Sequence, residues 1–573
     1  MSKTGFQDFT FGIITDTHIR APGGDKSSVF PVNEKADGRA RYAAELLAAQ
    51  KPDFTIHLGD MVHPQPHMKA YRPAAKSAHE ILAPLKPKLN FVPGNHDIGD
   101  KPSLVSPAGP ADEESLNQYS DNFGDSFYCF DYNQVLFVVV NSSLVNNSSK
   151  QEEVQRNWLE EIIKEAKNQR IFLFSHYPPF INDALEQSHY DNYAEPGRQW
   201  LLSLLDSSKI EAVFSGHVHH FFFNIIGETK LYCHPATSFT RQDYSALFSG
   251  PPENEYGRDD PSKFGVSLVK VSEKGHELDF LQTHGNTLEQ GEKFFEKTRC
   301  RPSKLNFLIP HMRHDWAQPK TLPYNGPMEE FSRKVARNDY FLLRLKQLGI
   351  KSVRVPISDL ENENILKRMG QFRALGISFV IFCVGIPTEN QRQILKSYSN
   401  LIEAFEIVTS NLQVLERREF TELATDMCIL VSKITTSASS VDSSKPFAHT
   451  VSCGFLSTEL GVVNEWISNF DNSLNIRFVF QIDWGQSPEF LISKWPHSKN
   501  KLALNVRLSD TNPAMANFNF KSIKNLLSQL QSISTQHPSI VIMLDTFADL
   551  DRGYHPRTGL INTSSNIHEW LFN

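Results

Sequence analysis

The stretch FSGHVHHFF, residues 214–222, places three histidines within four positions of an apolar run. A buried strand rarely carries three imidazoles, because each buried ring needs a hydrogen-bond partner or a metal ion. Side chains of an extended chain alternate between two faces, so His217 and His219 would share one face and His220 the other. We therefore expect His217 and His219 to act together at a strand end, and His220 to be a partly exposed residue that covers the strand exit.

Four other apolar runs in the first half lead into polar residues in the same way. "FTFGIITDTH" leads to Asp16 and His18, "DFTIHLGD" to Asp60, "KLNFVPGNHD" to Asn95 and His96, and "QRIFLFSHYPP" to His176. Helix-like segments such as "RARYAAELLAAQ" separate the runs, which is typical of an α/β fold. Ligand sites of α/β sheets form beyond the carboxyl ends of the strands, so we expect these side chains to meet at one edge.

Length and composition limit the classes of protein that this chain can belong to. The 573 residues are too many for one ordinary domain, which predicts two. The net charge of −7 is mild and disfavours a general nucleic-acid binder. The N-terminus has no secretory h-region, and no run of 18 apolar residues predicts a membrane span. The six scattered cysteines form no CxxC pair, so we expect reduced thiols and a cytoplasmic location.

The second half repeats the alternation with a different rhythm. A polar stretch at 272–303 precedes it, and we place a first domain at 1–285, a linker at 286–303 and a second domain at 304–573. Eight or nine apolar runs, among them "SFVIFCVG", "IRFVFQID" and "SIVIMLD", mostly alternate with helix-like segments. This rhythm favours a (β/α)₈ TIM-like barrel, and a doubly wound sheet is the alternative.

The side chains gathered in the first half suggest metal chemistry. Carboxylates, imidazoles and an amide oxygen, with no thiolate, suit divalent transition metals such as Mn, Fe, Co, Ni or Zn. Two such ions a few ångströms apart would clamp both the attacking and the leaving oxygen of a phosphoryl transfer.

The motifs DTH, GD, GNHD, SH and GHVH follow one another in this order between about residues 9 and 272. In this order they resemble the calcineurin-like metallophosphoesterase superfamily, and more narrowly its bacterial class III cyclic-nucleotide phosphodiesterases. The resemblance implies a four-layer α/β/β/α sandwich for the first domain. Ser/Thr phosphatases of the superfamily typically have GNHE and lack the paired GHxH, so GNHD with both histidines disfavours that branch.

The resemblance also implies roles for single residues. Asp16, His18 and His219 would hold the first metal, Asn95, His176 and His217 the second, and Asp60 would bridge the two. A water shared by two dications ionises near neutral pH and becomes the nucleophile. His96 matches the family's catalytic histidine, which would stabilise the phosphoryl group or protonate the leaving oxygen. Gly59, Gly94 and Gly216 would let the backbone come close to the site.

Four further residues are candidates for binding the substrate. His63 follows Asp60 closely and could line the mouth of the site, as could His67. His234 follows the GHVH strand, where the family often has a turn that forms the pocket. Arg198 lies in 189–200, which resembles a cap segment of some relatives.

Polar residues also stand where the predicted barrel strands end. They are His311, Arg313, His314, Asp315, Arg354, Gln481, Asp483, Arg507, Asp545, Asp549 and Arg552. Such residues at barrel strand ends suggest a site, but a fold-level argument does not define its chemistry. Either a scaffold or an appended second site fits.

We therefore predict a dinuclear-metal phosphodiesterase that cleaves a small organic phosphodiester, cyclic nucleotide-like or other, by a metal-bridging hydroxide. The alternatives are a phosphomonoesterase or protein phosphatase, and a non-catalytic metal-binding scaffold that presents the barrel. The expected partner is a small-molecule phosphoester; a homo-oligomer is allowed, while a membrane and nucleic acid are not expected. Every assigned ligand lies before about residue 275, so a chain ending near residue 280 is expected to hydrolyse an activated aryl phosphodiester.

Overall fold

The computed structural model divides the chain into two compact units. The first contains residues 1–301 and 319–343, and the second contains 302–318 and 344–573. The structure describes residues 5–572 except 87, 105, 107, 167–168, 208, 296–300, 314, 324–331, 437–450, 469–473, 499–500, 509–519 and 550–558. The predicted positions His314 and Arg552 lie outside the described residues. The predicted domain boundaries at 285 and 304 stay predictions.

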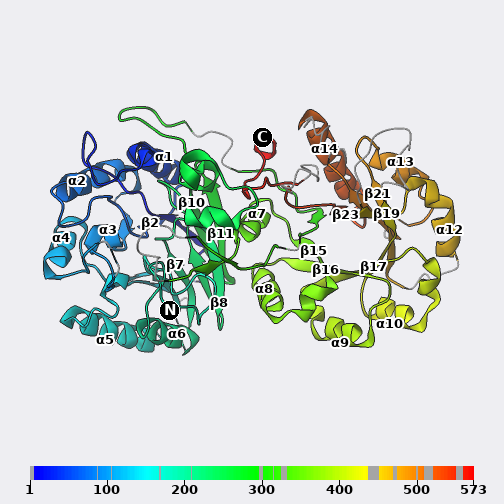
Figure 1. The fold of residues 1–573 in the computed structure, drawn as a ribbon, viewed down its shortest axis with the longest axis horizontal. Helices are drawn as coiled ribbons and strands as arrows, with labels where there is room; N and C mark the ends of the chain where they lie inside the picture. The colour runs from blue at the N-terminus through cyan, green and yellow to red at the C-terminus, as the bar shows by residue number, and fades with distance from the viewer. Residues whose placement is uncertain are drawn as a thin grey trace. The chain divides into compact units, whose positions relative to one another are not determined.

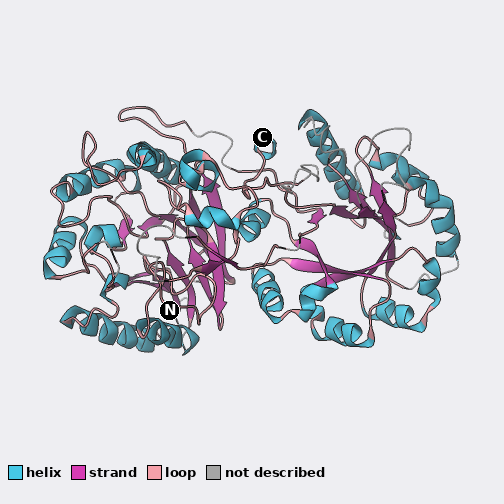
Figure 2. Cartoon of the chain, viewed as in Figure 1, coloured by secondary structure: helices cyan, strands magenta, loops and turns pink. Residues whose placement is uncertain are grey.

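Two sheets form the centre of the first unit (Figures 1 and 2). The first has the order β11 (Gly275–Gln282), β10 (Gly265–Ser272), β1 (Phe9–Ile14), β2 (Phe54–His57) and β3 (Leu89–Phe91). The second has the order β4 (Tyr128–Tyr132), β5 (Val135–Val139), β6 (Arg170–Phe174), β7 (Ile210–Ser215), β9 (Thr229–Cys233) and β8 (Phe222–Ile226). Strands β1 to β3 run parallel, as do β5 to β7, so their carboxyl ends share an edge.

Aromatic side chains pack between the two sheets. The ring of Phe11 in β1 stacks on Phe54 in β2 at a centroid distance of 5.4 Å. It also meets Phe137 of the second sheet edge-on at 5.6 Å, and Phe214 edge-on at 5.8 Å. Each large ring removes extensive apolar area from water, so this layer fixes the two sheets face to face.

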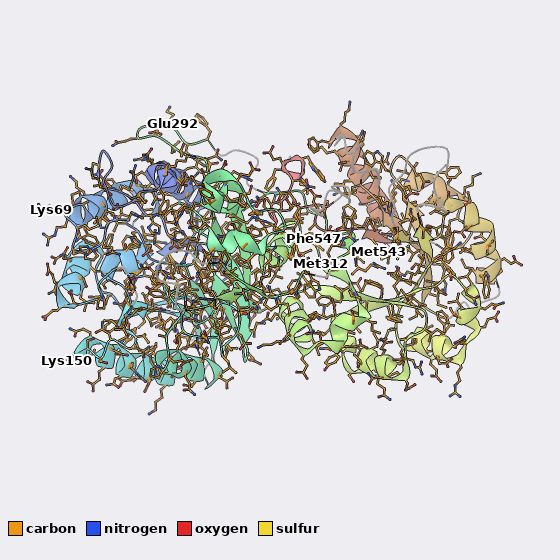
Figure 3. All side chains as sticks on the ribbon, in the orientation of Figure 1. Lys69, Lys150, Glu292, Met312, Met543 and Phe547 are labelled. Atoms are coloured by element: carbon orange, nitrogen blue, oxygen red, sulfur yellow. The ribbon has the colours of Figure 1, made fainter. Side chains whose placement is uncertain are left out.

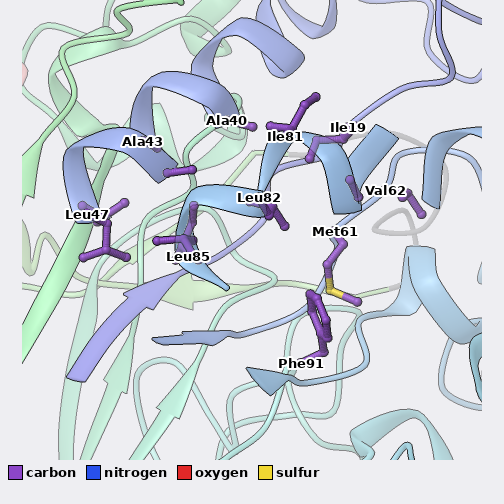
Figure 4. Close-up of a cluster of buried hydrophobic side chains, with 14 of the residues drawn as sticks. Ile19, Ala40, Ala43, Leu47, Met61, Val62, Ile81, Leu82, Leu85 and Phe91 are labelled. Carbon is purple, nitrogen blue, oxygen red and sulfur yellow. The ribbon is translucent and has the colours of Figure 1, made fainter. Parts of the chain in front are cut away.

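Helices cover the outer faces. On the first sheet lie α1 (Ala36–Ala49) and α2 (Tyr71–Ile81), and on the second α5 (Lys150–Glu165) and α6 (Gly197–Ser207). In α1 the buried residues Ala40, Ala43 and Leu47 recur at helical spacing and form one apolar face (Figure 4). The predicted four-layer α/β/β/α sandwich is thereby confirmed.

The second unit is built on eight parallel strands. Their order is β12 (Leu308–Pro310), β23 (Val541–Leu544), β22 (Leu502–Val506), β21 (Ile476–Ile482), β18 (Ile429–Ser432), β17 (Ile402–Val408), β16 (Ser378–Val384) and β15 (Ser352–Pro356). A parallel bridge between His311 and Arg354 joins the two ends of this order, so the sheet is a nearly closed barrel. This confirms the predicted TIM-like class over the doubly wound alternative.

Helices connect successive strands of this barrel. They are α7 (Tyr340–Gln347), α8 (Glu363–Ala374), α9 (Glu389–Ser397), α10 (Arg418–Asp426), α12 (Leu460–Ser468), α13 (Pro488–Lys494) and α14 (Phe520–Gln536). Met543 in β23 and the neighbouring Met312 and Phe547 are buried in this unit, whereas Lys69, Lys150 and Glu292 of the first unit are exposed (Figure 3).

Residues 319–343 return to the first unit and protect its edge strand β8. The segment contains the short pair β13 (Lys320–Thr321) and β14 (Val335–Ala336). The backbone N–H of Phe223 in β8 donates to Asp339 at 2.8 Å, and its carbonyl accepts from Arg337 at 2.8 Å. Side chains thus satisfy backbone groups that an edge strand would otherwise leave unpaired. No motif in the sequence predicts this return.

Within the described ranges, no helix has the length and apolar character needed to cross a bilayer. Cys129, Cys233, Cys383, Cys428 and Cys453 are free thiols, and Cys300 lies outside the described residues. The cytoplasmic location stays a prediction.

Candidate metal centre

Side chains from four loops at the strand carboxyl ends meet in two groups. The first joins Asp16, His18, Asp60 and His219, and the second joins Asp60, His176 and His217; within each, the ligand atoms lie within 4.8 Å of one another. Asp60 belongs to both groups, which is the position that the sequence predicted for a bridging carboxylate.

The donor atoms of the first group lie close together. His18 Nε2 lies 3.1 Å from His219 Nε2 and 3.5 Å from a carboxylate oxygen of Asp60. His219 Nε2 also lies 3.2 Å from Asp16 Oδ1. Four buried donor atoms thus point at a common centre.

Asn95 joins the second group through its side-chain oxygen. This atom lies 3.1 Å from His176 Nε2 and 3.0 Å from His217 Nδ1. His176 Nε2 is in turn 3.3 Å from Asp60 Oδ1. The amide, two imidazoles and one carboxylate form a second donor set.

The outer nitrogens of two rings fix their tautomers. Nδ1 of His219 lies 2.8 Å from the carbonyl of Phe239, and Nδ1 of His176 lies 2.8 Å from the carbonyl of Leu58. A carbonyl only accepts, so each Nδ1 carries a hydrogen and each Nε2 is turned toward the carboxylates. Carboxylate, imidazole and amide donors that converge in this way suit divalent cations, and the donor set fits the implied metals.

The charges of the site support the same conclusion. Burial by itself would raise the pKa of Asp60, but His176 and His96 outweigh it and hold that pKa well below its usual range. The pKa of Asp16 is likewise lowered, because His219 outweighs the effect of burial. Within the described residues, the ion-pair partners of both carboxylates are histidines. Two buried anions therefore have only imidazoles to balance them, which leaves room for cations.

The backbone at the site corrects the expected alternation of an extended strand. Strand β1 ends at Ile14 and β7 at Ser215, before the ligands. Five of the candidate ligands lie in the left-handed region, with φ of 49° at Asp16, 47° at His18, 53° at Asp60, 67° at His217 and 60° at His219. Asp and His tolerate this region better than most residues, at about 1–3 kcal/mol each. The ligand pairs converge through strained turns that the surrounding backbone holds.

His220 differs from the expectation of a partly exposed residue. Its side chain is buried, its Nε2 lies 3.2 Å from the carbonyl of Arg241, and its ring packs on Tyr244 at 5.2 Å. The reason is that the chain after His219 continues into buried β8 and does not leave the fold.

Two glycines are required by close approach. A Cβ atom on Gly94 would collide with the backbone nitrogen and the carboxylate of Asp60. A Cβ on Gly216 would lie 2.6 Å from an Asp16 carboxylate oxygen, below any ordinary contact. The motifs GNHD and GHVH therefore need their glycines so that neighbouring loops can touch.

His96 and His63 lie at the rim of the two donor groups. The backbone N–H of His96 donates to Asp60 at 2.9 Å, and its Nδ1 bonds the carbonyl of His63. The half-buried ring of His96 meets His18 edge-on at 4.7 Å. His63 Nδ1 lies 3.0 Å from His18 Nδ1. The structure thus brings both predicted residues to the candidate metal centre.

His234 and Arg198 are placed differently from the predicted substrate contacts. His234 is buried, with its Nδ1 3.2 Å from Ser267 and its ring near Phe214. Arg198 donates to Glu195 at 2.8 Å and to the carbonyl of Glu186, within its own segment. Both side chains form internal contacts of the fold, which does not support the prediction that they bind substrate.

Asp191 is a residue of the site that the sequence reasoning missed. Its buried carboxylate accepts from Lys334 at 2.6 Å, from Tyr244 at 2.8 Å and from Arg241, and it lies 3.5 Å from His217 Nε2. Burial would raise the pKa of Asp191, but Arg241 and Lys334 hold it well below its usual range. A carboxylate behind a ligand histidine orients the ring and makes it a better donor. Its partners are far apart in the sequence, so no local motif could have revealed it.

A cavity of about 330 Å³ opens beside the loops that carry His63 and His96. Its lining includes Gln65, His67, Gly99, Asp112 and Gln118. Gln65 is two residues from His63, and Gly99 follows the short helix α3 (Asn95–Ile98). His67 therefore lines a cavity formed in part by the chain segment that follows His63.

A four-layer sandwich that gathers carboxylates, histidines and an asparagine at its strand ends is the architecture of a metallophosphoesterase. The family model described as calcineurin-like phosphoesterase matches residues 9–221. Residues 9–221 of the first unit are therefore similar to the calcineurin-like phosphoesterases.

Curated relatives include both phosphatases and phosphodiesterases. A serine/threonine-protein phosphatase, CPPED1 of Rattus norvegicus, is 29% identical over 30% of this chain and 54% of its own length. "Probable cyclic nucleotide phosphodiesterase PSM_A2567" of Pseudoalteromonas sp. (strain SM9913) is 27% identical over 41% of this chain and 80% of its own length. The glycerophosphodiester phosphodiesterase GpdQ of Enterobacter lignolyticus (strain SCF1) is 25% identical over 39% and 76%. The chain spans about half the length of the CPPED1 relatives that it matches.

Proposed function

We propose that the first unit is a dinuclear-metal phosphodiesterase that hydrolyses a small organic phosphodiester. The observation that carries the proposal is Asp60, whose carboxylate belongs to both groups of converging donor atoms. A single carboxylate between two donor sets suits two ions held side by side.

The proposed ligand assignment follows the two groups. Asp16, His18 and His219 would hold one ion, Asn95, His176 and His217 would hold the other, and Asp60 would contribute to both. When bound, two divalent ions such as Mn, Fe, Zn, Co or Ni would supply a nucleophile at neutral pH and stabilise charge on the phosphoryl group. The protein contributes the fixed donor geometry and the buried carboxylates.

His96 is the proposed catalytic residue beside the ions. Its backbone is tied to Asp60 and its Nδ1 to the His63 carbonyl, so the ring has a fixed orientation. A ring held in this way can donate a proton to the leaving oxygen or stabilise the phosphoryl group. The organic part of the substrate would then occupy the cavity lined by His67 and Gln65.

The similarity to CPPED1 favours a second candidate, a phosphomonoesterase or protein phosphatase. The presence of GNHD and GHVH was expected to disfavour that branch, but the relatives named serine/threonine-protein phosphatase match this chain too. The similarity to the two phosphodiesterases extends over more of their own length, which supports the diesterase. A metal-binding scaffold without catalysis is the third alternative.

One assay separates these functions. The full chain is treated with a chelator, reloaded with Mn, and given bis-p-nitrophenyl phosphate, p-nitrophenyl phosphate and a phosphoserine peptide in parallel. We expect Mn-dependent turnover with the diester preferred. A preference for the monoester or the peptide would establish the phosphatase alternative, and metal binding without turnover of any substrate would establish the scaffold.

A further inference from the structure

The barrel of the second unit has a polar layer at the carboxyl-terminal end of its strands. Its apolar centre is formed by Ile309, Val380, Ala404, Leu430, Val479, Ala503 and Met543, one residue from each of seven strands. Strand side chains share a face with every second residue. Two positions further along the same strands stand His311, Phe382, Glu406, Ser432, Gln481, Asn505 and Asp545, and all but Phe382 are polar or charged.

Contacts between strands show that this second set of residues forms one layer. Arg354 of β15 donates to Glu406 of β17, across the intervening strand β16. On the way its guanidinium lies 3.9 Å above the ring of Phe382 in β16, so the three side chains share a face. Ser432 of β18 continues the layer by donating to Glu406 at 2.6 Å. An interior that changes from apolar to polar toward the strand ends is built for a ligand, since packing alone would favour apolar residues.

Arg354 is fully engaged within the layer. Besides Glu406, its guanidinium lies 3.3 Å from His311 Nδ1 and 3.6 Å from the sulfur of Cys453. The buried Arg354–Glu406 pair is therefore neutral as a unit and leaves no free charge.

Two other arginines at this end have no carboxylate at hydrogen-bond distance among the described residues. Arg507 stands two residues after Asn505, is only 6% exposed, and its Nε has no hydrogen-bond partner in the described part of the chain. Its nearest carboxylates, Asp545 and Asp483, lie at 3.9 and 4.0 Å. Arg313, two residues after His311, hydrogen-bonds the hydroxyl of Thr546 at 3.0 Å.

The positive charges of these arginines lie close enough to repel one another. Burial lowers the pKa of Arg313, and the nearby charges of Arg354 and Arg507 lower it further against the opposing effect of Asp545. Guanidinium groups placed together, with the carboxylates of the described residues beyond hydrogen-bond distance, are costly unless an anion completes them.

We propose that the carboxyl-terminal end of the barrel binds a small organic anion, whose phosphate or carboxylate group is held by Arg507 and Arg313. The polar layer formed by Asn505, Gln481 and His311 faces the remainder of this ligand. The site lies wholly in the second unit and shares no residue with the metal centre.

The test measures binding of two simple anions to the full-length protein by isothermal titration. Inorganic phosphate and succinate represent the two forms of the anionic group. The variants are Arg507→Met and, as a milder second change, Arg313→Met. The control is Arg418→Met, which removes the same charge from an exposed helix of the same unit. Circular dichroism confirms that each variant is folded.

We expect one saturable binding component of the wild type to weaken by roughly ten- to a hundredfold in Arg507→Met, because a charge-assisted hydrogen bond to a buried group contributes that much. Arg418→Met is expected to bind like the wild type, and phosphoester turnover is expected to be unchanged in all three variants. Whichever of phosphate and succinate binds identifies the anionic group. If neither shows a component that Arg507→Met and Arg313→Met weaken, the proposal is wrong, whatever the outcome for the metal centre.

Discussion

Nε2 of His217 faces Asp191 at 3.5 Å, while its Nδ1 faces Asn95 at 3.0 Å. One imidazole thus connects the second donor group to a buried network of charges. Asp191 is held in place by Lys334, which comes from the segment that returns to the first unit after residue 318. The orientation of a candidate metal ligand therefore depends on a residue more than a hundred positions later in the chain.

Replacing Asp191 by Asn is expected to lower metal affinity and turnover by about 10- to 100-fold, as loss of the partner of a ligand histidine does. Metal content after dialysis and initial rates measure this. Asp243→Asn is the matched control, because Asp243 also binds Lys334 but makes no recorded contact with His217. Equal loss of metal in both variants would mean that the network acts only through folding.

Lys334→Met should lower the free energy of unfolding by about 3–5 kcal/mol, since it removes one of the two cations that Asp191 and Asp243 share and leaves two buried carboxylates on Arg241. Lys35→Met is the comparison, because the Lys35 side chain is 51% exposed in its pair with Asp259. We expect it to cost about 1 kcal/mol or less. Urea unfolding of the two variants gives the difference, and similar values would contradict a special role for the returning segment.

Asp60→Ala is expected to abolish activity and the binding of both ions, because two dications would repel each other without their shared anion. Metal analysis should show about two ions per wild-type chain. Asp53→Ala is the control; Asp53 bonds Thr10 and Tyr132 at the opposite end of the strands. Full turnover by Asp60→Ala would show that the assigned centre is not the catalytic one.

For His96→Ala we expect turnover to fall by about 10²–10⁴-fold with metal content nearly intact, as for loss of a general acid. His79→Ala, which removes a partly buried histidine from α2, should leave the rate unchanged. If His96→Ala instead loses its metal, His96 is a ligand and the assignment must be redrawn.

Gly94→Ala should destabilise the protein by about 1–3 kcal/mol and weaken metal binding, because its Cβ would displace Asp60. Gly109→Ala provides the contrast, since no atom lies within 4 Å of a Cβ built there. Thermal unfolding together with metal titration distinguishes the two. An unchanged metal affinity in Gly94→Ala would show that the loop can move to make room for the added Cβ atom.

The polar residues at the strand ends of the first unit were predictable, because each one belongs to a short local motif. Apolar runs followed by Asp16, Asp60, Asn95, His176 and His217 place polar side chains at one sheet edge, and the structure brings them together. The left-handed turns were not predictable, since φ depends on neighbouring loops. The substrate contacts of His234 and Arg198 stay predictions, and both side chains are buried in the fold. A polar residue near a motif gives no information on whether it faces solvent or the core.

The role of residues 319–343 could not be predicted from the sequence either. Asp191, Arg241 and Lys334 come from three separate segments, and only the folded chain shows that they meet. The expectation that a chain ending near residue 280 is sufficient for hydrolysis overlooks this segment, since such a chain would lack Lys334 and the residues that cover β8.

The chain passes between the two units three times, near residues 301, 319 and 344. No single recombination breakpoint in the coding sequence therefore separates a complete first unit from a complete barrel. A cut before 319 leaves the first unit without its returning segment, and a cut after 343 leaves the barrel without its first strand, β12. Any exchange of this barrel for another would have to transfer two interleaved pieces of gene together.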